Sequence, residues 1–121
     1  MLNRDRIECM ARAKRLICRS SALEEGGKAV RFDLPDGHGS VSCFTVRFDG
    51  IVYAYVNSCP HRGTELDWNP GEVFDESGLY LICATHGATF DPQTGQCLSG
   101  PCQGACLKAL PVEEHGDVVT I

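Results

Sequence analysis

The chain has 121 residues, 43% of them hydrophobic, and a formal net charge of −5. This length suits one small domain with a modest core and leaves no room for a second catalytic domain. The acidic balance argues against nucleic acid as a partner. The apolar runs, such as 51–56, are far shorter than the roughly 18–20 residues that a membrane helix requires.

The N-terminal segment, residues 1–15, is expected to be a lead-in to a single domain over residues 16–121. Apolar residues recur there at helical spacing, which predicts a short amphipathic helix. Several arginines occur in this segment, but no continuous apolar stretch follows them and no two of them are adjacent. Neither a secretory nor a twin-arginine signal is therefore recognised, and we expect a cytoplasmic protein.

The remainder of the chain is expected to be all-β. Short apolar runs bounded by Gly, Pro and Asp predict two hairpins late in the chain and one around Asp49-Gly50, where Gly50 supplies the positive φ of a tight turn. Many short strands with such turns indicate a small β-sandwich or barrel. The expected strands are 16–20, 28–34, 44–48, 51–56, 79–82, 88–90, 96–98, 107–112 and 118–121.

Two short motifs each supply one thiolate and one imidazole. Cys59-Pro60-His61 follows the predicted strand 51–56, and Cys83-Ala84-Thr85-His86 follows the predicted strand 79–82. Sulfur and imidazole ligands leave both zinc and iron open. The spacing differs from that of zinc fingers, which pair two Cys and then two His. Mixed motifs favour two adjacent metal ions, with both cysteines on one and both histidines on the other.

The pattern Cys-x-His and Cys-x-x-His, with Gly63, Gly87 and Gly100-Pro101, resembles the Rieske ferredoxin family over roughly residues 16–121. The resemblance implies one [2Fe-2S] cluster held by two hairpin loops, with two histidines replacing two cysteines on one iron. It also implies that the histidines face solvent, that the glycines let the backbone approach the cluster sulfurs, and that the Gly100-Pro101 loop covers the cluster. The implied ligands are Cys59, His61, Cys83 and His86.

Departures from the high-potential members of this family predict a lower reduction potential. Those members carry an extra disulfide between the ligand loops, where this chain has Thr64 and Thr85, and serine and tyrosine hydroxyls, where this chain has Ala88 and Phe90. Fewer hydrogen-bond donors stabilise the reduced cluster less. We expect a midpoint in the lower part of the roughly −150 to +300 mV Rieske range.

The other cysteines fall into two groups. Cys9, Cys18 and Cys43 lie among apolar residues and are interpreted as small buried side chains. The group around Gly100-Pro101 could be a second metal site or contain a disulfide, but packing or thiols are favoured in a reducing compartment. This second group comprises Cys97, Cys102 and Cys106.

Charge is uneven along the sequence. Through His61 there are nine Lys and Arg against seven Asp and Glu, and from Arg62 onward two against nine, which gives +2 and −7. The acidic residues between the motifs either rim the cluster and steer docking to basic partners, or form a solvated loop; they are Glu65, Asp67, Glu72, Asp75 and Glu76. Trp68 is expected to pack over the same loop, as a core residue rather than an electron relay. His38 and His115 are expected in exposed turns without chemistry.

The leading interpretation is an electron carrier rather than an enzyme: a cytoplasmic monomer that takes one electron from a reductase to an oxygenase or another oxidoreductase. One alternative is the small subunit of a larger oxidoreductase, similar to that of nitrite reductase, although many such subunits lack the ligands. The Rieske domain of a ring-hydroxylating oxygenase would need a further domain with mononuclear iron. A structural zinc module is the fourth interpretation, and it would be colourless.

Overall fold

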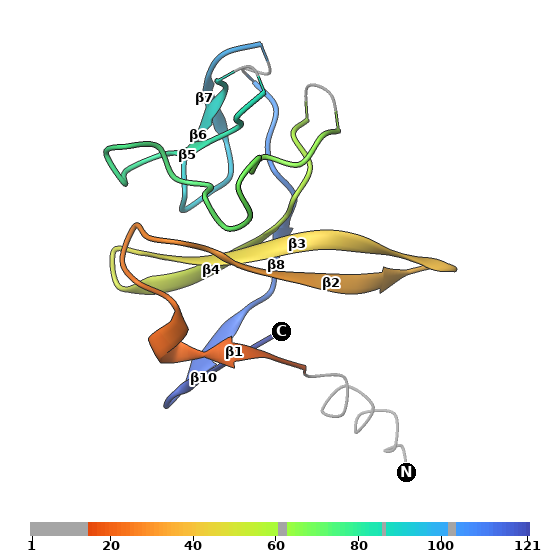
Figure 1. Ribbon diagram of the computed structural model, residues 1–121, viewed down its shortest axis with the longest axis vertical. Helices are drawn as coiled ribbons and strands as arrows, with labels where there is room; N and C mark the ends of the chain where they lie inside the picture. The colour runs from red at the N-terminus through yellow and green to blue at the C-terminus, as the bar shows by residue number, and fades with distance from the viewer. Residues whose placement is uncertain (1–14, 61–62, 86, 102–103) are drawn as a thin grey trace.

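The computed structural model describes residues 15–60, 63–85, 87–101 and 104–121, and places their strands in three layers (Figure 1). The predicted N-terminal helix lies outside the described residues. A 3-10 helix over Ser20–Ala22 follows the first strand. The strands are β1 Leu16–Arg19, β2 Val30–Asp36, β3 Gly39–Phe48, β4 Ile51–Val56, β5 Leu81–Ile82, β6 Thr89–Phe90, β7 Cys97–Ser99, β8 Ala109–Leu110, β9 Glu113–His115 and β10 Val118–Thr120.

The three sheets are antiparallel. The middle sheet has the order β2-β3-β4-β8, a second sheet has the order β1-β10-β9, and the third has the order β5-β6-β7. The expected all-β class is confirmed. Within the described residues no helix has the length and hydrophobicity needed to cross a bilayer.

The middle sheet is apolar on both faces, because the side chains of β3 and β4 alternate between two cores. Phe44 pairs with Tyr55, and Val46 pairs with Tyr53, so these four side chains share one face. That face packs against the β5-β6-β7 layer. The opposite face contributes Val52 to a smaller core with Leu23, Val30 and Val119. The larger core is the one that carries the cysteines of both motifs.

The β3–β4 hairpin forms as predicted. Its turn residues Asp49 and Gly50 have φ values of 54° and 77°, and Phe48 pairs with Ile51. Positive φ at both central residues is the type I′ geometry that suits the twist of the flanking strands. The hairpin therefore extends β4 straight toward the first motif.

The prediction for the last hairpin was wrong. Residues 107–112 do not pair with 118–121; β8 lies within that range and pairs instead with β4. β10 pairs with β1 and with β9, the latter expected to be a loop, and His115 pairs with Val118 across a turn at Gly116. Proline at position 111, which lacks an N–H, separates β8 from β9. His115 is thus the exposed end of a strand, and its ring lies 2.9 Å from Glu113.

Tyr55 ties the middle sheet to the layer that carries the second motif. Its hydroxyl donates a 2.7 Å hydrogen bond to the carbonyl of Pro92, in the β6–β7 turn. Burial raises the pKa of Tyr55, which keeps the hydroxyl a donor. The same turn has Gly95 so close that a Cβ there would lie 2.9 Å from the Tyr55 ring. This turn therefore packs closely on the aromatic ring.

Candidate metal centre

The first loop follows β4 and is closed by two backbone hydrogen bonds at Cys59. The N–H of Cys59 donates to the carbonyl of Thr64 at 2.8 Å, and the N–H of Gly63 donates to the carbonyl of Cys59 at 2.6 Å. Gly63 has a φ of 75°, which favours glycine. The loop thereby closes on itself with Cys59 at its base, and Cys59 is only 3% exposed.

The second loop repeats this pattern between β5 and β6. The N–H of Cys83 donates to the carbonyl of Ala88 at 2.9 Å, and the N–H of Gly87 donates to the carbonyl of Cys83 at 2.8 Å. Gly87 has a φ of 74°, and Cys83 is 1% exposed. In both loops the cysteine thus bonds to the residues four and five positions later. The two loops, although they differ in sequence, therefore have the same local backbone geometry.

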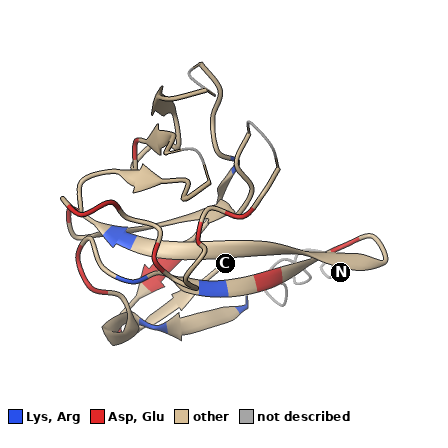
Figure 2. Ribbon diagram, turned by 45° about the horizontal axis from the view of Figure 1, so that its top comes forward, with Lys and Arg blue, Asp and Glu red and all other residues tan. Residues whose placement is uncertain are grey.

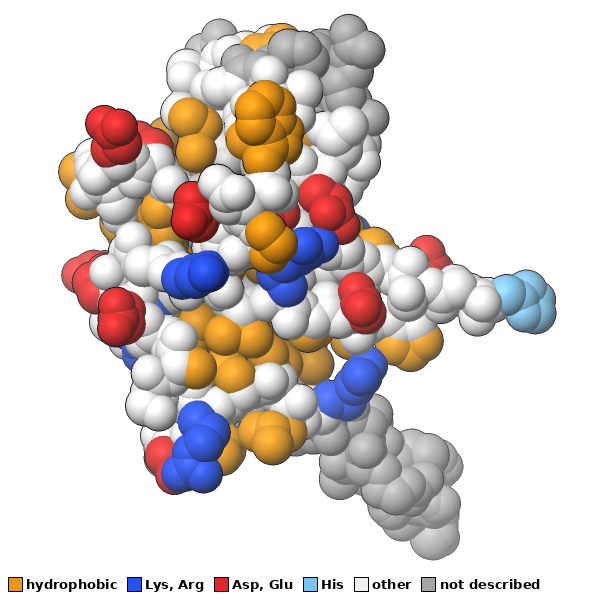
Figure 3. Space-filling model, in the orientation of Figure 1, with side chains coloured by type: hydrophobic (Ala, Val, Ile, Leu, Met, Phe, Trp, Pro, Cys, Tyr) orange, Lys and Arg blue, Asp and Glu red, His pale blue; other side chains and the backbone are white. Residues whose placement is uncertain are grey.

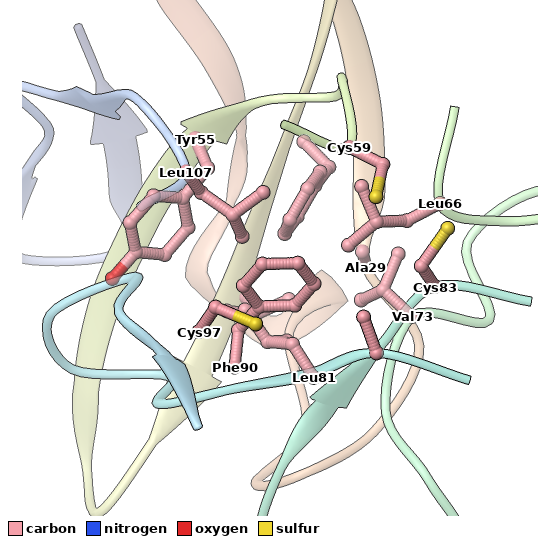
Figure 4. Close-up of a cluster of buried hydrophobic side chains, with 13 residues drawn as sticks. Ala29, Tyr55, Cys59, Leu66, Val73, Leu81, Cys83, Phe90, Cys97 and Leu107 are labelled. Atoms are coloured by element: carbon pink, nitrogen blue, oxygen red, sulfur yellow. The ribbon is translucent and has the colours of Figure 1, made fainter. Parts of the chain in front are cut away.

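The two cysteines belong to one core cluster, although they come from different layers. Figure 4 shows both sulfur atoms at the same edge of that cluster, beside Leu66. The carbonyl of Leu66 accepts a 2.9 Å hydrogen bond from the N–H of Ala84, which directly links the two loops. Two buried sulfur atoms at one edge are what one iron of a two-iron centre would need as ligands.

The two histidines of the motifs, His61 and His86, lie outside the described residues. Without them, the described part of the chain has no group of three or more His, Cys, Asp or Glu placed to hold a metal ion. Each histidine belongs to a loop whose ends are fixed by the hydrogen bonds of Cys59 or Cys83. The predicted histidine ligands therefore remain predictions, while the predicted cysteines are brought together.

A third loop packs against the second one. Gly100 has a φ of 102°, and a Cβ at this position would lie 2.7 Å from the Cα of Ala88 and 3.0 Å from its Cβ. Ala88 is fully buried and is the residue whose carbonyl holds Cys83. Gly100 therefore lies directly against the second loop, while the expectation that the Gly100-Pro101 loop covers the cluster stays a prediction.

The remaining described cysteines differ from the two in the loops. Cys43 is fully buried, Cys18 is partly buried, and burial raises the pKa of both thiols. Cys97 packs in the larger core, where its Sγ lies 3.4 Å from the carbonyl of Ser99. Cys106 is exposed. Packing is thus confirmed for Cys43 and Cys97, whereas Cys9 and Cys102 lie outside the described residues.

Two expectations about the segment between the loops were wrong. Trp68 is 73% exposed, so it is not a core residue. Asp67 is 5% exposed and does not rim the surface as its acidic neighbours Glu65 and Glu72 do. Leu66, next to Asp67, packs in the core, and the carboxylate of Asp67 accepts hydrogen bonds inside the protein.

No Lys or Arg occurs in the sequence from Gly63 to Leu107. In Figure 2, accordingly, strands β5, β6 and β7 carry no blue segments.

The motif search missed the polar side chains that hold the first loop in place. Asn57, two residues before Cys59, is 3% exposed and bonds to both Leu66 and Asp67. Arg31, from β2, contacts the same segment. A polar residue at the end of an apolar strand was the only signal in the sequence for Asn57. Nothing in the sequence indicated Arg31.

The comparisons with known proteins agree with this geometry. The sequence profile described as Rieske [2Fe-2S] domain matches residues 13–114. A solved ferredoxin of carbazole 1,9a-dioxygenase from Nocardioides aromaticivorans IC177 is 26% identical, has a TM-score of 0.65, and the match covers 88% of this chain and 94% of that one. The ferredoxin of Sphingomonas yanoikuyae B1 is 24% identical with a TM-score of 0.67, and the match covers 89% and 96%, which shows a shared fold.

A longer curated protein also matches. The oxidoreductase NdmD of Pseudomonas putida is 34% identical over 79 residues, which are 59% of this chain and 13% of that protein. The match therefore spans only a small part of NdmD.

Proposed function

The chain belongs to the Rieske [2Fe-2S] domain family, and from that premise we propose that it is an electron carrier without catalytic activity of its own. Its cofactor is one [2Fe-2S] cluster. Cys59 and Cys83 would hold one iron, and His61 and His86 the other, within a single domain over residues 16–121 that a lead-in over 1–15 precedes. When bound, the cluster supplies a redox centre that takes up one electron at a time.

The observation that carries this proposal is the repeated geometry of the two loops. Cys59 and Cys83 have the same hydrogen bonds to residues four and five positions later, and each loop ends at a glycine with nearly the same φ. Because the loops hang from β4 and β5 and share the larger core, their positions change little when charge at the site changes. A fixed site with small reorganisation is what electron transfer requires.

We propose that the partners are a reductase as electron donor and an oxygenase or another oxidoreductase as acceptor. The likeness to a ferredoxin of a dioxygenase supports an oxygenase. On the face shown in Figure 3, hydrophobic side chains in the upper half lie between acidic ones. Glu65, Trp68 and Glu72 are exposed and lie in the segment that directly follows the first loop. An exposed tryptophan among carboxylates suits a basic partner surface.

The match to NdmD favours one alternative, in which this domain works as a component of a larger oxidoreductase. In that protein the similar region is 13% of the whole. A carrier that exchanges between two partners would be isolated as a monomer, which we propose here. A stable component would be isolated with its larger partner. Size-exclusion chromatography of the native protein from its own cells separates the two cases.

We further propose a cytoplasmic location. Cys106 is exposed and Cys18 is partly exposed, and both are thiols. Exposed thiols are usual in a reducing compartment, where glutathione and thioredoxin keep them reduced.

Electron paramagnetic resonance of the dithionite-reduced protein tests the proposed function. We expect a Rieske-type signal with an average g below that of all-cysteine clusters, and one electron taken up per chain. Iron and sulfide assays on the same sample should give two of each per chain. A colourless protein that contains zinc instead of iron would overturn the assignment.

The apolar side chains at positions 88 and 90 lead to a second expectation. Ala88 and Phe90 are both fully buried beside Cys83 in the larger core, and neither side chain can donate a hydrogen bond. The oxidised cluster is then favoured relative to high-potential relatives. We expect a redox titration to give a midpoint in the lower part of the roughly −150 to +300 mV range. A value well above about +100 mV, inside that same range, would contradict this reasoning.

A further inference from the structure

A buried polar network closes the base of the first loop. Asn57 leaves β4 just before the loop, and its Oδ1 accepts a 2.8 Å hydrogen bond from the N–H of Leu66, just after the loop. Its Nδ2 donates to Oδ1 of Asp67 at 2.9 Å. The backbone of Asn57 is itself held, because its N–H donates to the carbonyl of Ser42 on β3 at 2.8 Å. Asn57 therefore joins the two ends of the first loop to each other through its side chain and to the middle sheet through its backbone.

Asp67 places a carboxylate inside the protein. Its side chain is fully buried, and its second oxygen accepts a 2.8 Å hydrogen bond from the N–H of Gly71. Nε of Arg31 lies 3.6 Å from that same oxygen. The amide of Asn57, the N–H of Gly71 and the guanidinium are all donors, which is the environment of an ionised carboxylate.

Arg31 supplies the opposing charge. From β2 its guanidinium also contacts Oε2 of Glu65 at 2.8 Å and the hydroxyl of Ser42 at 3.1 Å. Its side chain is 32% exposed, so the pair is only partly open to solvent. Because the sequence has no Lys or Arg from Gly63 to Leu107, this guanidinium reaches an otherwise acidic segment from a different layer.

The network continues to the second loop. Leu66, whose N–H is held by Asn57, uses its carbonyl to accept a hydrogen bond from Ala84 at 2.9 Å. Ala84 directly follows Cys83, and Leu66 packs in the same core cluster as Cys59 and Cys83. The buried charge of Asp67 is thus one residue from the link between the two loops, where a low local dielectric screens it little.

We infer that Asp67 and Arg31 are positioning residues whose opposed charges set the reduction potential of the cluster, with Asn57 holding them against the first loop. The inference rests on the proposed function. An added electron is disfavoured by the carboxylate and favoured by the guanidinium, so the two residues shift the potential in opposite directions. Neither residue is a ligand.

Three variants and one control test this inference by redox titration of the cluster-loaded protein. Asp67→Asn should raise the midpoint, and Arg31→Gln should lower it, each by about tenfold in the equilibrium constant of reduction, which is 59 mV for a one-electron couple. Arg31→Lys keeps the charge and should stay near the wild-type value. Asp33→Asn removes an exposed carboxylate on the same strand as Arg31, and solvent screening should leave the midpoint unchanged.

Opposite signs in the two charge variants are the result that a merely structural role would not give. Loosened loops would move Asp67→Asn and Arg31→Gln in the same direction, and that outcome, or no shift in either, would overturn the inference. If Asp67→Asn does not fold, the difference between Arg31→Gln and Arg31→Lys decides alone. A wild-type protein without a Rieske signal would instead refute the proposed function.

Discussion

Alanine in place of Cys59 or Cys83 is expected to give a folded protein that holds at least about tenfold less cluster than wild type, since even the loss of an outer-shell partner can cost that much metal affinity. Each substitution removes one of the two proposed sulfur ligands. Cys97 belongs to the same core but lies on the opposite side of it from Cys59 and Cys83 (Figure 4), and Cys43 lies outside that core. The measurement is iron and sulfide per chain together with the visible spectrum. The melting temperature should also fall, because ligand binding to the native state adds to its stability.

Cys43→Ala is the matched control for these two variants. Cys43 is as deeply buried as Cys83, so the same sulfur atom is removed from a comparable environment. Alanine there should reduce stability by about 1–3 kcal/mol through lost packing and leave the cluster content unchanged. Full cluster content in the Cys59 or Cys83 variant, or an equal loss in all three, would contradict the assignment of the sulfur ligands.

The sequence was sufficient to predict where the two cysteine-containing loops form, because both are encoded locally. A cysteine followed four residues later by a glycine with positive φ is a short-range pattern, and each copy follows an apolar strand. The β3–β4 hairpin was equally accessible, since Asp49-Gly50 between two apolar runs specifies its turn. Features set by neighbouring residues could therefore be read without knowledge of the tertiary structure.

Features set by residues distant in the sequence could not be predicted from local patterns. The Asp67 carboxylate is buried with Asn57, just after β4, and Arg31, on β2, as partners, and no pattern around Asp67 in the sequence predicts these contacts. The prediction that Asp67 rims the surface failed for this reason. The last hairpin failed similarly, because β8 pairs with β4, more than fifty residues earlier in the sequence. Trp68 is exposed although its indole is large and apolar, and the described structure gives it no place in the core.

Gly100→Ala is expected to destabilise the protein through both backbone strain and a clash with the second loop. Gly100 has a φ of 102°, which costs a residue with a Cβ about 1–2 kcal/mol. The new Cβ would also lie 2.7 Å from the Cα of Ala88, and overpacking of this kind costs about 1–3 kcal/mol more. Ala88 is fully buried, and the contacted Cα is part of the backbone of the second loop. Ala88 therefore cannot move away without displacing that loop.

Gly104→Ala separates the two contributions. Gly104 has nearly the same φ, 98°, but a Cβ there would meet nothing within 4 Å. Both variants should therefore lose the backbone contribution, and only Gly100→Ala should lose the further 1–3 kcal/mol or so from the clash. Denaturant unfolding measures both losses. The carbonyl of Ala88 accepts the hydrogen bond of Cys83, so Gly100→Ala should also change the paramagnetic resonance signal and speed cluster loss, while Gly104→Ala leaves both unchanged. Equal stability losses with unchanged spectra would show that the third loop yields freely and does not hold the second loop in place.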